Sequence, residues 1–427
     1  MKTVIKNKLF IARYNFLYLM VFLFISGCSA PMTLMPTPNV LVNKPYSEKQ
    51  IPDLQRNADI EVIYVTDRSP IKSARKAYGP NRSPSKAFGT ATVSFRNRGV
   101  DWKTLKDYSQ QKKRPNELTY AMRRIEEKGR FPPTPYAFKR TPQGVQIDKE
   151  VSTQKLRETK KLRNIILKKL SQSQSKDVVL FVHGYNNSFD EATFTLAGMW
   201  HFLNRQGVPI AYSWPATSDK LLGYFTDRES SEFTIFHLKE TLRVLFDTPE
   251  IENIHLIAHS RGTDVATSAL RELLIEYRAA GKNPRKDFKT ANLILAAPDL
   301  NFGVIKQRLM AEQFGIGFGQ ITVYTSDGDN ALGLAQFLMK GVRFGRVKSL
   351  DIGLNERNIF ERLGNVSLIK VPKSDTEFGH DYFHSNPAVS SDIIRIIQTQ
   401  AKPGTKSRPL TLIENNFWSL PENYLSN

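Results

Sequence analysis

The chain has 427 residues and a formal net charge of +20, with 61 Lys and Arg against 41 Asp and Glu. Hydrophobic residues make up 40 % of it and charged residues 24 %, which excludes a wholly disordered or fibrous protein. The single cysteine excludes an intrachain disulfide and a zinc site built on several cysteines. The length suits two or three domains, or one large α/β domain with additions.

Residues 1–27 have the organisation of a bacterial signal peptide. Four cations and no acid in residues 1–15 precede a ten-residue apolar run, residues 16–25, which is too short to span a bilayer as a helix. Ser26-Gly27-Cys28 follows and resembles the lipobox, in which cleavage leaves a lipid-modified cysteine at the N-terminus. Ser29 after it is, by the same resemblance, typical of sorting to the outer membrane. We expect a protein of the bacterial cell envelope, lipid-anchored through Cys28 and facing the periplasm; an uncleaved anchor is the alternative.

The next part of the chain is expected to form a tether and an N-terminal extension. Residues 28–58 are rich in Pro, Asn and Ser without periodicity, as in a tether. Residues 59–176 contain strand patterns at 60–66 and 87–95, followed by a basic insertion at 96–176 with 22 Lys and Arg against 8 Asp and Glu. We expect this insertion to contact anionic lipid, and we expect no nucleic-acid partner because no binding module is recognisable.

The pattern changes after Lys176. Short apolar runs bounded by turn signals alternate with helical stretches, which predicts an α/β core with a mostly parallel central sheet flanked by helices. We place this core at 177–400 and a polar C-terminal tail at 401–427. The predicted strands of the core are residues 178–182, 210–214, 254–258, 293–297 and 321–324.

Ser260 lies between a predicted strand and a predicted helix. The sequence Ala258-His259-Ser260-Arg261-Gly262 places small residues two before and two after the serine, as a tight strand-to-helix turn requires. Such a turn exposes the hydroxyl above the sheet, and the helix N-terminus behind it favours developing negative charge. The alternative is a serine that only caps the helix and has no catalytic role. The position after an apolar strand favours a nucleophile elbow.

An α/β hydrolase needs an oxyanion loop before its nucleophile. Residues 181–186, Phe-Val-His-Gly-Tyr-Asn, supply this loop at the end of an earlier strand. We expect the backbone amides of Tyr185 and Arg261 to be the oxyanion donors, because the second donor follows the nucleophile. His183 is interpreted as a structural residue.

An acid and a histidine should follow the serine in chain order. Asp329 follows the later strand and is the favoured acid, with Asp299 as the alternative acid and Asp327 as a third candidate. His380 is the favoured general base and His384 the alternative base. The two histidines are four residues apart, but without a third ligand cluster we expect no metal site.

The sequence resembles a bacterial branch of the α/β-hydrolases whose members mostly lack an assigned function. The resemblance implies an α/β-hydrolase fold with Ser260, Asp329 and His380 as the triad, and it supplies no substrate. Ala258 departs from the usual glycine, and the basic insertion is a second departure. The matching stretches are collinear over about 60–385: Tyr64-Val65-Thr66-Asp67-Arg68, Phe181 to Asn187, Tyr212-Ser213-Trp214-Pro215, Tyr224 with Asp227-Arg228-Glu229, Ala258 to Gly262, Ala297-Pro298-Asp299, Tyr324-Thr325-Ser326 with Asp329, and Gly379-His380 with Tyr382.

Together these features predict a serine hydrolase that cleaves a carboxylic ester or a related acyl bond, without a cofactor. Its substrate would be a small-molecule or lipid ester. The alternative is a catalytically inactive envelope protein that keeps the hydrolase fold for binding or scaffolding, because a fold does not guarantee a function.

Overall fold

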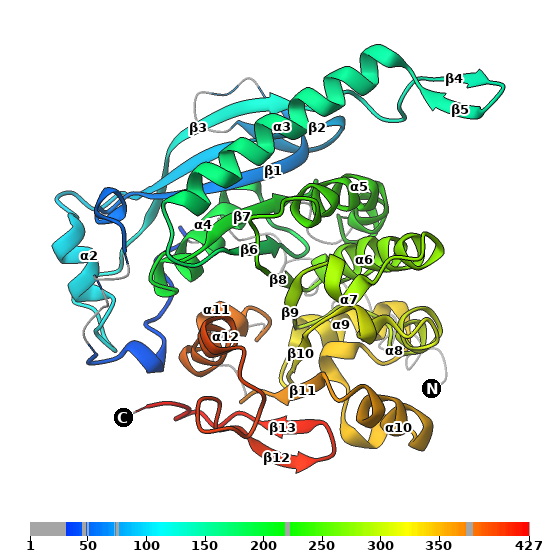
Figure 1. The fold of residues 1–427 in the computed structure, drawn as a ribbon. Helices are drawn as coiled ribbons and strands as arrows, with labels where there is room; N and C mark the ends of the chain where they lie inside the picture. The colour runs from blue at the N-terminus through cyan, green and yellow to red at the C-terminus, as the bar shows by residue number, and fades with distance from the viewer. Residues whose placement is uncertain are drawn as a thin grey trace, which may run out of the picture.

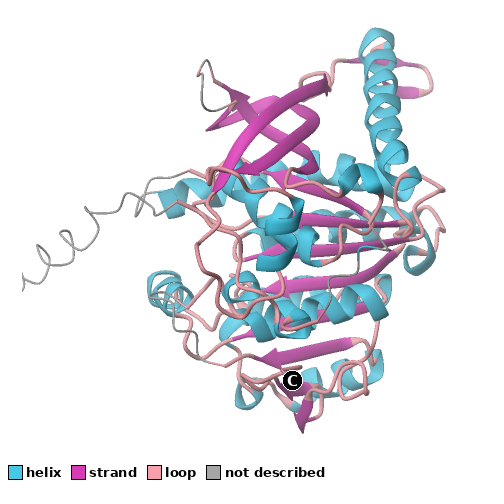
Figure 2. Cartoon of the chain, turned by 90° about the vertical axis from the view of Figure 1, so that its left-hand side faces the viewer, coloured by secondary structure: helices cyan, strands magenta, loops and turns pink. Residues whose placement is uncertain are grey.

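The computed structural model describes residues 31–44, 48, 51–71, 73, 77–217, 223–372 and 379–426. Its centre is a sheet of eleven strands in the order β12-β13-β11-β10-β9-β8-β6-β7-β1-β2-β3 (Figure 1). Helices cover both sides of this sheet (Figure 2). The predicted α/β architecture with a mostly parallel central sheet is confirmed.

The parallel part of the sheet contains the predicted apolar strands. Their apolar side chains are buried on both faces, because helices lie over each side, and this explains their continuous apolar sequence. The predicted strands are β6 (Asp177–Val182), β7 (Val208–Ser213), β8 (Asn253–His259), β9 (Thr290–Ala296) and β10 (Gln320–Thr325), and β11 (Val366–Lys370) is a further parallel strand beside β10.

Five more strands extend this sheet at its two edges. At one edge β1 (Ile60–Pro70) runs parallel to β7, and β2 (Tyr78–Phe95) and β3 (Tyr120–Arg130) continue antiparallel. At the other edge β13 (Phe417–Ser419) is parallel to β11, and β12 (Thr411–Glu414) closes the sheet. A separate hairpin, β4 (Phe138–Thr141) and β5 (Gly144–Ile147), lies at the beginning of α3.

The helices divide between two buried clusters, one on each face of the sheet. On one face lie α3 (Lys149–Ser171), α5 (Gly223–Phe246), α6 (Gly262–Ala279), α8 (Phe302–Ile305) and α10 (Leu354–Leu363). On the other face lie α4 (Phe189–Phe202), α11 (Tyr382–Ser385) and α12 (Pro387–Thr399). The remaining helices are α2 (Trp102–Tyr108), α7 (Pro284–Asp287) and α9 (Asn330–Met339).

The segment expected to be a tether packs on the body over much of its described length, which corrects that expectation. Leu34, Val40 and Ile51 are almost completely buried. The Leu34 N–H donates to the Leu118 carbonyl at 2.8 Å, and the Tyr120 N–H donates to the Met32 carbonyl at 2.9 Å. An irregular segment can bury apolar side chains at uneven spacing, so its lack of periodicity does not show that it is free.

The basic insertion and the polar tail are also parts of the folded body. Within 96–176, β3 is an edge strand of the central sheet and α3 covers one of its faces. In the tail, β12 and β13 complete the sheet, and Arg408 is fully buried in a bidentate pair with Asp392 at 2.8 and 2.9 Å. Cys28 and the predicted signal peptide lie outside the described residues, and no helix within the described ranges is long and apolar enough to span a bilayer.

Candidate active site

Ser260 occupies a strained turn between β8 and α6. Its φ of +52° lies in the left-handed region, which residues other than glycine seldom adopt and which is often found at functional sites. The Ser260 N–H donates to the Ala296 carbonyl of β9 at 3.0 Å. The Ser260 carbonyl accepts from the N–H and the hydroxyl of Thr263, at 3.1 and 2.6 Å. The neighbouring strand and the first turn of the helix therefore hold the serine in this conformation.

The predicted oxyanion loop lies directly against this turn. A Cβ atom added to Gly184 would be 2.7 Å from the Ser260 Cβ, and one added to Gly262 would be 2.2 Å from the His183 carbonyl oxygen. Both distances are far below a van der Waals contact, so glycine is required at both positions. Tyr185 follows Gly184 in the same turn and is half-buried.

His380 lies next to the elbow and is oriented by Asp329. The His380 Nδ1 is 2.7 Å from the Asp329 Oδ2, and the His259 Nε2 donates to the His380 carbonyl at 3.1 Å. The rings of His259 and His380 are 4.9 Å apart. Asp329 is fully buried at the N-cap of α9, where its Oδ1 accepts the Leu332 N–H at 2.9 Å. This cap fixes the carboxylate that faces the histidine.

His380 is protonated more readily in the protein than an imidazole is in water, because of the charges around it. Burial lowers its pKa, but the charge and the hydrogen bond of Asp329 outweigh that effect, helped by Asp299 and Asp381, and the pKa is raised above the ordinary value. Burial, together with the charge on His380, lowers the pKa of His259 well below the ordinary value, so His259 is neutral. Among the described residues, no group of three or more His, Cys, Asp or Glu side chains is placed to hold a metal ion.

Comparison with known proteins identifies the family. The model of a family described as "Alpha/beta hydrolase of unknown function (DUF900)" matches residues 158–399. The chain belongs to this family. A solved lipase-esterase related protein from Clostridium acetobutylicum ATCC 824 is 11 % identical, with 52 % of this chain and 82 % of that chain covered at a TM-score of 0.21. No curated protein matches the sequence.

The structure of this α/β hydrolase places the two candidate acids in different surroundings. Asp329 faces His380, whereas Asp299 pairs with the Arg261 Nη2 at 2.8 Å and lies 3.4 Å from the Arg343 Nε. Asp299 is almost completely buried, and it holds the side chain of the residue that follows the nucleophile. The third candidate, Asp327, forms an ion pair with Lys370 at 3.0 Å, and both side chains are about half exposed.

The alternative base, His384, is a residue of the short helix α11. Its ring meets the Phe383 ring edge-on at 4.6 Å, and burial lowers its pKa. Phe383 in turn stacks on His259 at 4.5 Å. His384 therefore lies one aromatic ring further from the elbow than His380 does.

Arg68 is a residue of this hydrolase site to which the sequence assigned no role. Its side chain is 1 % exposed and enters the region beneath the oxyanion loop from the end of β1. The guanidinium Nη2 donates to the Asn187 carbonyl at 2.5 Å and is 3.4 Å from the His183 Nε2, so it contacts both ends of the loop. The Nε and Nη1 atoms donate to the Ser213 hydroxyl at 2.9 Å, the Ala216 carbonyl at 3.0 Å and the Gly79 carbonyl at 3.2 Å.

His183 is held as a neutral structural residue by these contacts. Its ring stacks on Trp214 with 5.2 Å between centroids, and its Nδ1 is 2.8 Å from the Gly184 carbonyl. Burial, together with the charge on Arg68, lowers its pKa to about 3. The loop beside Ser260 is therefore held in place by contacts with the His183 imidazole and the Arg68 guanidinium.

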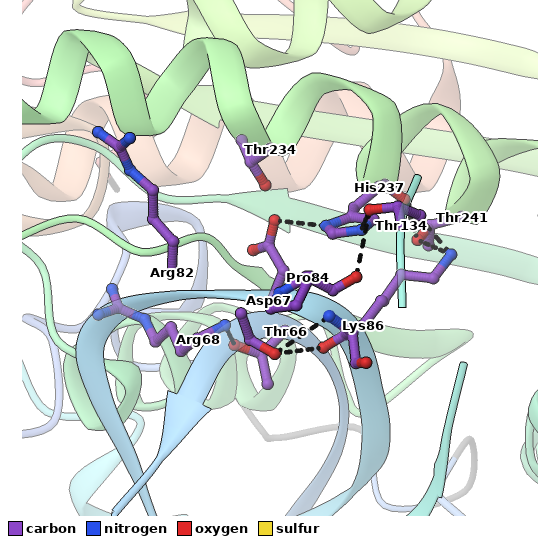
Figure 3. Close-up of polar contacts among 12 residues, drawn as sticks. Thr66, Asp67, Arg68, Arg82, Pro84, Lys86, Thr134, Thr234, His237 and Thr241 are labelled. Atoms are coloured by element: carbon purple, nitrogen blue, oxygen red, sulfur yellow. Dashed lines mark hydrogen bonds and ion pairs between the residues drawn. The ribbon is translucent and has the colours of Figure 1, made fainter. Parts of the chain in front are cut away.

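A polar network next to Arg68 ties the N-terminal strands to helix α5 (Figure 3). Asp67 Oδ2 is 2.9 Å from His237 Nδ1, and the other nitrogen of that ring is 3.1 Å from the Thr134 hydroxyl. Lys86 is buried nearby and donates to the Thr241 hydroxyl at 3.1 Å, and burial lowers its pKa to about 7. The stretch Thr66-Asp67-Arg68 thus contacts both α5 and the oxyanion loop.

The first turns of α5 also reach the loop. The buried Asp227 carboxylate accepts the Thr217 N–H at 2.7 Å and the Asn186 N–H at 3.5 Å. Burial raises its pKa to about 6. Both Asp227 and Arg68 belong to stretches through which the sequence resembles the hydrolase family, and this resemblance could have identified them, although Arg68 lies outside the residues that the family model matches.

Proposed function

We propose that the protein is a serine hydrolase that cleaves a carboxylic ester or a related acyl bond through Ser260, His380 and Asp329. The observation that carries this proposal is the hydrogen bond between His380 and the buried Asp329 beside a serine held at positive φ. A histidine with one nitrogen on a carboxylate has its other nitrogen available to take the proton of an adjacent hydroxyl. Membership of the hydrolase family and the order Ser, Asp, His support it.

In the proposed reaction, the Ser260 oxygen attacks the carbonyl carbon while its proton passes to His380 Nε2. Asp329 stabilises the imidazolium through Nδ1. The backbone amides of Tyr185 and Arg261 stabilise the negative oxygen of the tetrahedral intermediate. The intermediate then collapses, and the alcohol leaves with the proton from His380.

The resulting acyl-serine is hydrolysed by water. His380 takes a proton from the water as it attacks, and it returns that proton to the Ser260 oxygen when the acid is released. The net reaction consumes one ester and one water, and it forms one acid and one alcohol. The substrate class we propose is a small-molecule or lipid ester.

Labelling with a fluorophosphonate probe tests the nucleophile. We expect the wild-type protein to be labelled on Ser260, and the Ser260→Ala variant to lose both the labelling and the hydrolysis of short-chain and medium-chain esters. Ser268→Ala is the matched control, because Ser268 is a buried serine on the adjoining helix. Undiminished labelling of Ser260→Ala would refute the assignment. Absence of labelling and of activity in the folded wild type would support a binding or scaffolding role instead.

We also propose that Cys28 is the site of lipid attachment and that the protein resides in the bacterial envelope. The proposal is supported by the sequence alone, in which the only cysteine follows an apolar run and two small residues. Growth with labelled palmitate should label the wild-type chain and leave Cys28→Ala unlabelled. Equal labelling of the two chains would contradict this attachment site.

A further inference from the structure

Residues 136–163, which we call the arm, form a projection built from the β4–β5 hairpin and the first half of α3 (Figure 1). Its base is fixed to helix α5. Lys155 forms an ion pair with Glu240 at 2.5 Å, and the rings of Tyr136 and Phe236 meet at 5.9 Å. The hairpin closes onto the start of α3 through the Asp148 N–H, which donates to the Ala137 carbonyl at 2.8 Å. The arm is therefore an ordered part of the body.

One face of the hairpin is apolar and exposed. In the antiparallel register Phe138 lies opposite Ile147, and Arg140 lies opposite Val145. Opposed residues share a face, as do residues two apart in one strand, so the three apolar side chains lie together. They are exposed by 60 % for Phe138, 68 % for Val145 and 42 % for Ile147, and they belong to neither buried cluster.

The same arm is strongly basic. It carries eight Lys and Arg against three Asp and Glu, whereas residues 177–427 carry 26 against 28. Arg140 lies on the apolar face itself, and the Lys139 side chain on the other face is 75 % exposed. Positive charge is therefore concentrated where the exposed apolar surface is, and not over the protein as a whole.

We propose that the arm docks on an anionic phospholipid bilayer. The three apolar side chains would enter the boundary between headgroups and acyl chains, and the surrounding cations would contact the negative headgroups. The charge complementarity and the apolar face together favour this occupant. Charge alone would suffice for a nucleic acid, and an apolar face alone would suffice for a second copy of the chain.

A tryptophan reporter in the full chain tests the proposal. Phe138→Trp places the reporter on the apolar face, and Leu412→Trp is the matched control on β12, where Leu412 is 52 % exposed at the opposite edge of the sheet. Each variant is mixed with vesicles of equal parts phosphatidylglycerol and brominated phosphatidylcholine, or of brominated phosphatidylcholine alone. We expect bromine to quench the added fluorescence of Phe138→Trp on the anionic vesicles only, and not that of Leu412→Trp.

The contributions of charge and apolar surface are then separated in the wild-type background. Removing one cation by Arg140→Gln should weaken binding to anionic vesicles about fivefold at low salt. The combined change of Phe138, Val145 and Ile147 to Ser should weaken it at least about tenfold. Equal quenching of both reporters, no quenching, or equal quenching on uncharged vesicles would overturn the proposal. The proposal would also be overturned if the triple Ser variant abolished a dimer, or a complex with an oligonucleotide, while its binding to vesicles was unchanged. None of these readouts needs hydrolase activity, so they are independent of the proposed reaction.

Discussion

The buried Arg68 guanidinium leads to a prediction about both stability and reaction rate. Arg68→Met keeps much of the side-chain volume but removes every donor. The carbonyls of Gly79, Ala216 and Asn187 and the hydroxyl of Ser213 then lose a partner inside the protein. Each unsatisfied buried group costs ~1–3 kcal/mol, which gives a sum between ~4 and ~12 kcal/mol before any relaxation.

Two effects reduce this sum. First, water can enter the space that the guanidinium leaves. Second, the variant no longer buries a charge, which is unfavourable in the wild type, where burial lowers the pKa of Arg68 to about 10. We therefore expect a net loss of about 3–4 kcal/mol in the free energy of unfolding, measured by urea denaturation. Arg68→Lys keeps the charge with at most three donors and should lie between wild type and Arg68→Met.

The rate should fall because the loop beside Ser260 loses its support. We expect the rate constant for fluorophosphonate labelling, and kcat for a short-chain ester, to fall ~10²-fold in Arg68→Met, with a smaller effect on KM. Arg82→Met is the control, because Arg82 bonds Ser230 and Glu229 near the surface and should cost less than ~1 kcal/mol without altering the rate. A kcat within twofold of wild type in folded Arg68→Met would refute the role of Arg68 in positioning the loop.

Four further predictions concern the proposed triad and the oxyanion loop beside it. Asp329→Asn should lower kcat ~10³–10⁴-fold with little change in KM. Asp299→Asn should mainly destabilise the fold, because it weakens buried ion pairs. A larger loss of kcat in Asp299→Asn than in Asp329→Asn would make Asp299 the acid. A general base must be neutral, and the pKa of His380 is raised above 6.5, so the plot of activity against pH should rise with a midpoint above pH 6.5. Asp329→Asn should move this midpoint to lower pH. An unchanged midpoint would contradict the pairing of Asp329 with His380. The same shift means that the pair stabilises the fold fully below pH 6.5 and less as pH rises through the raised pKa. Gly184→Ala should abolish labelling of Ser260, because the added Cβ would lie 2.7 Å from the serine Cβ; labelling at the wild-type rate would show that the loop can move aside.

The sheet could be predicted from the sequence because its strands are buried on both faces. Such strands appear as short apolar runs between turn signals, and this pattern identified β6 to β10. The outer parts of the fold could not be predicted in this way. The segment around Leu34 and Val40 buries apolar residues without any period. Arg408 lies in a polar sequence, and only the fold places Asp392, sixteen residues earlier, beside its buried guanidinium.

The sequence could predict which residues belong to the candidate site, because they follow one another in the order expected of the family. Chain order selected Ser260, His380 and a choice of acids, but only the three-dimensional arrangement distinguishes Asp329, which faces His380, from Asp299, which faces Arg261. The contacts of Arg68 could not be inferred, because its partners come from three separate segments of the chain, at Gly79, in residues 183–187 and in residues 213–216. A local sequence pattern carries no information about such partners.

The two edges of the sheet have a practical consequence for anyone who makes a shorter protein. The family match covers residues 158–399, and a fragment cut at those limits would lack β1, β2 and β3 at one edge and β12 and β13 at the other. Strands β7 and β11 would then present unpaired backbone groups and apolar faces, which are templates for aggregation. We expect such a fragment to be insoluble. We expect the smallest unit that folds on its own to extend from the segment around Leu34 to beyond Arg408.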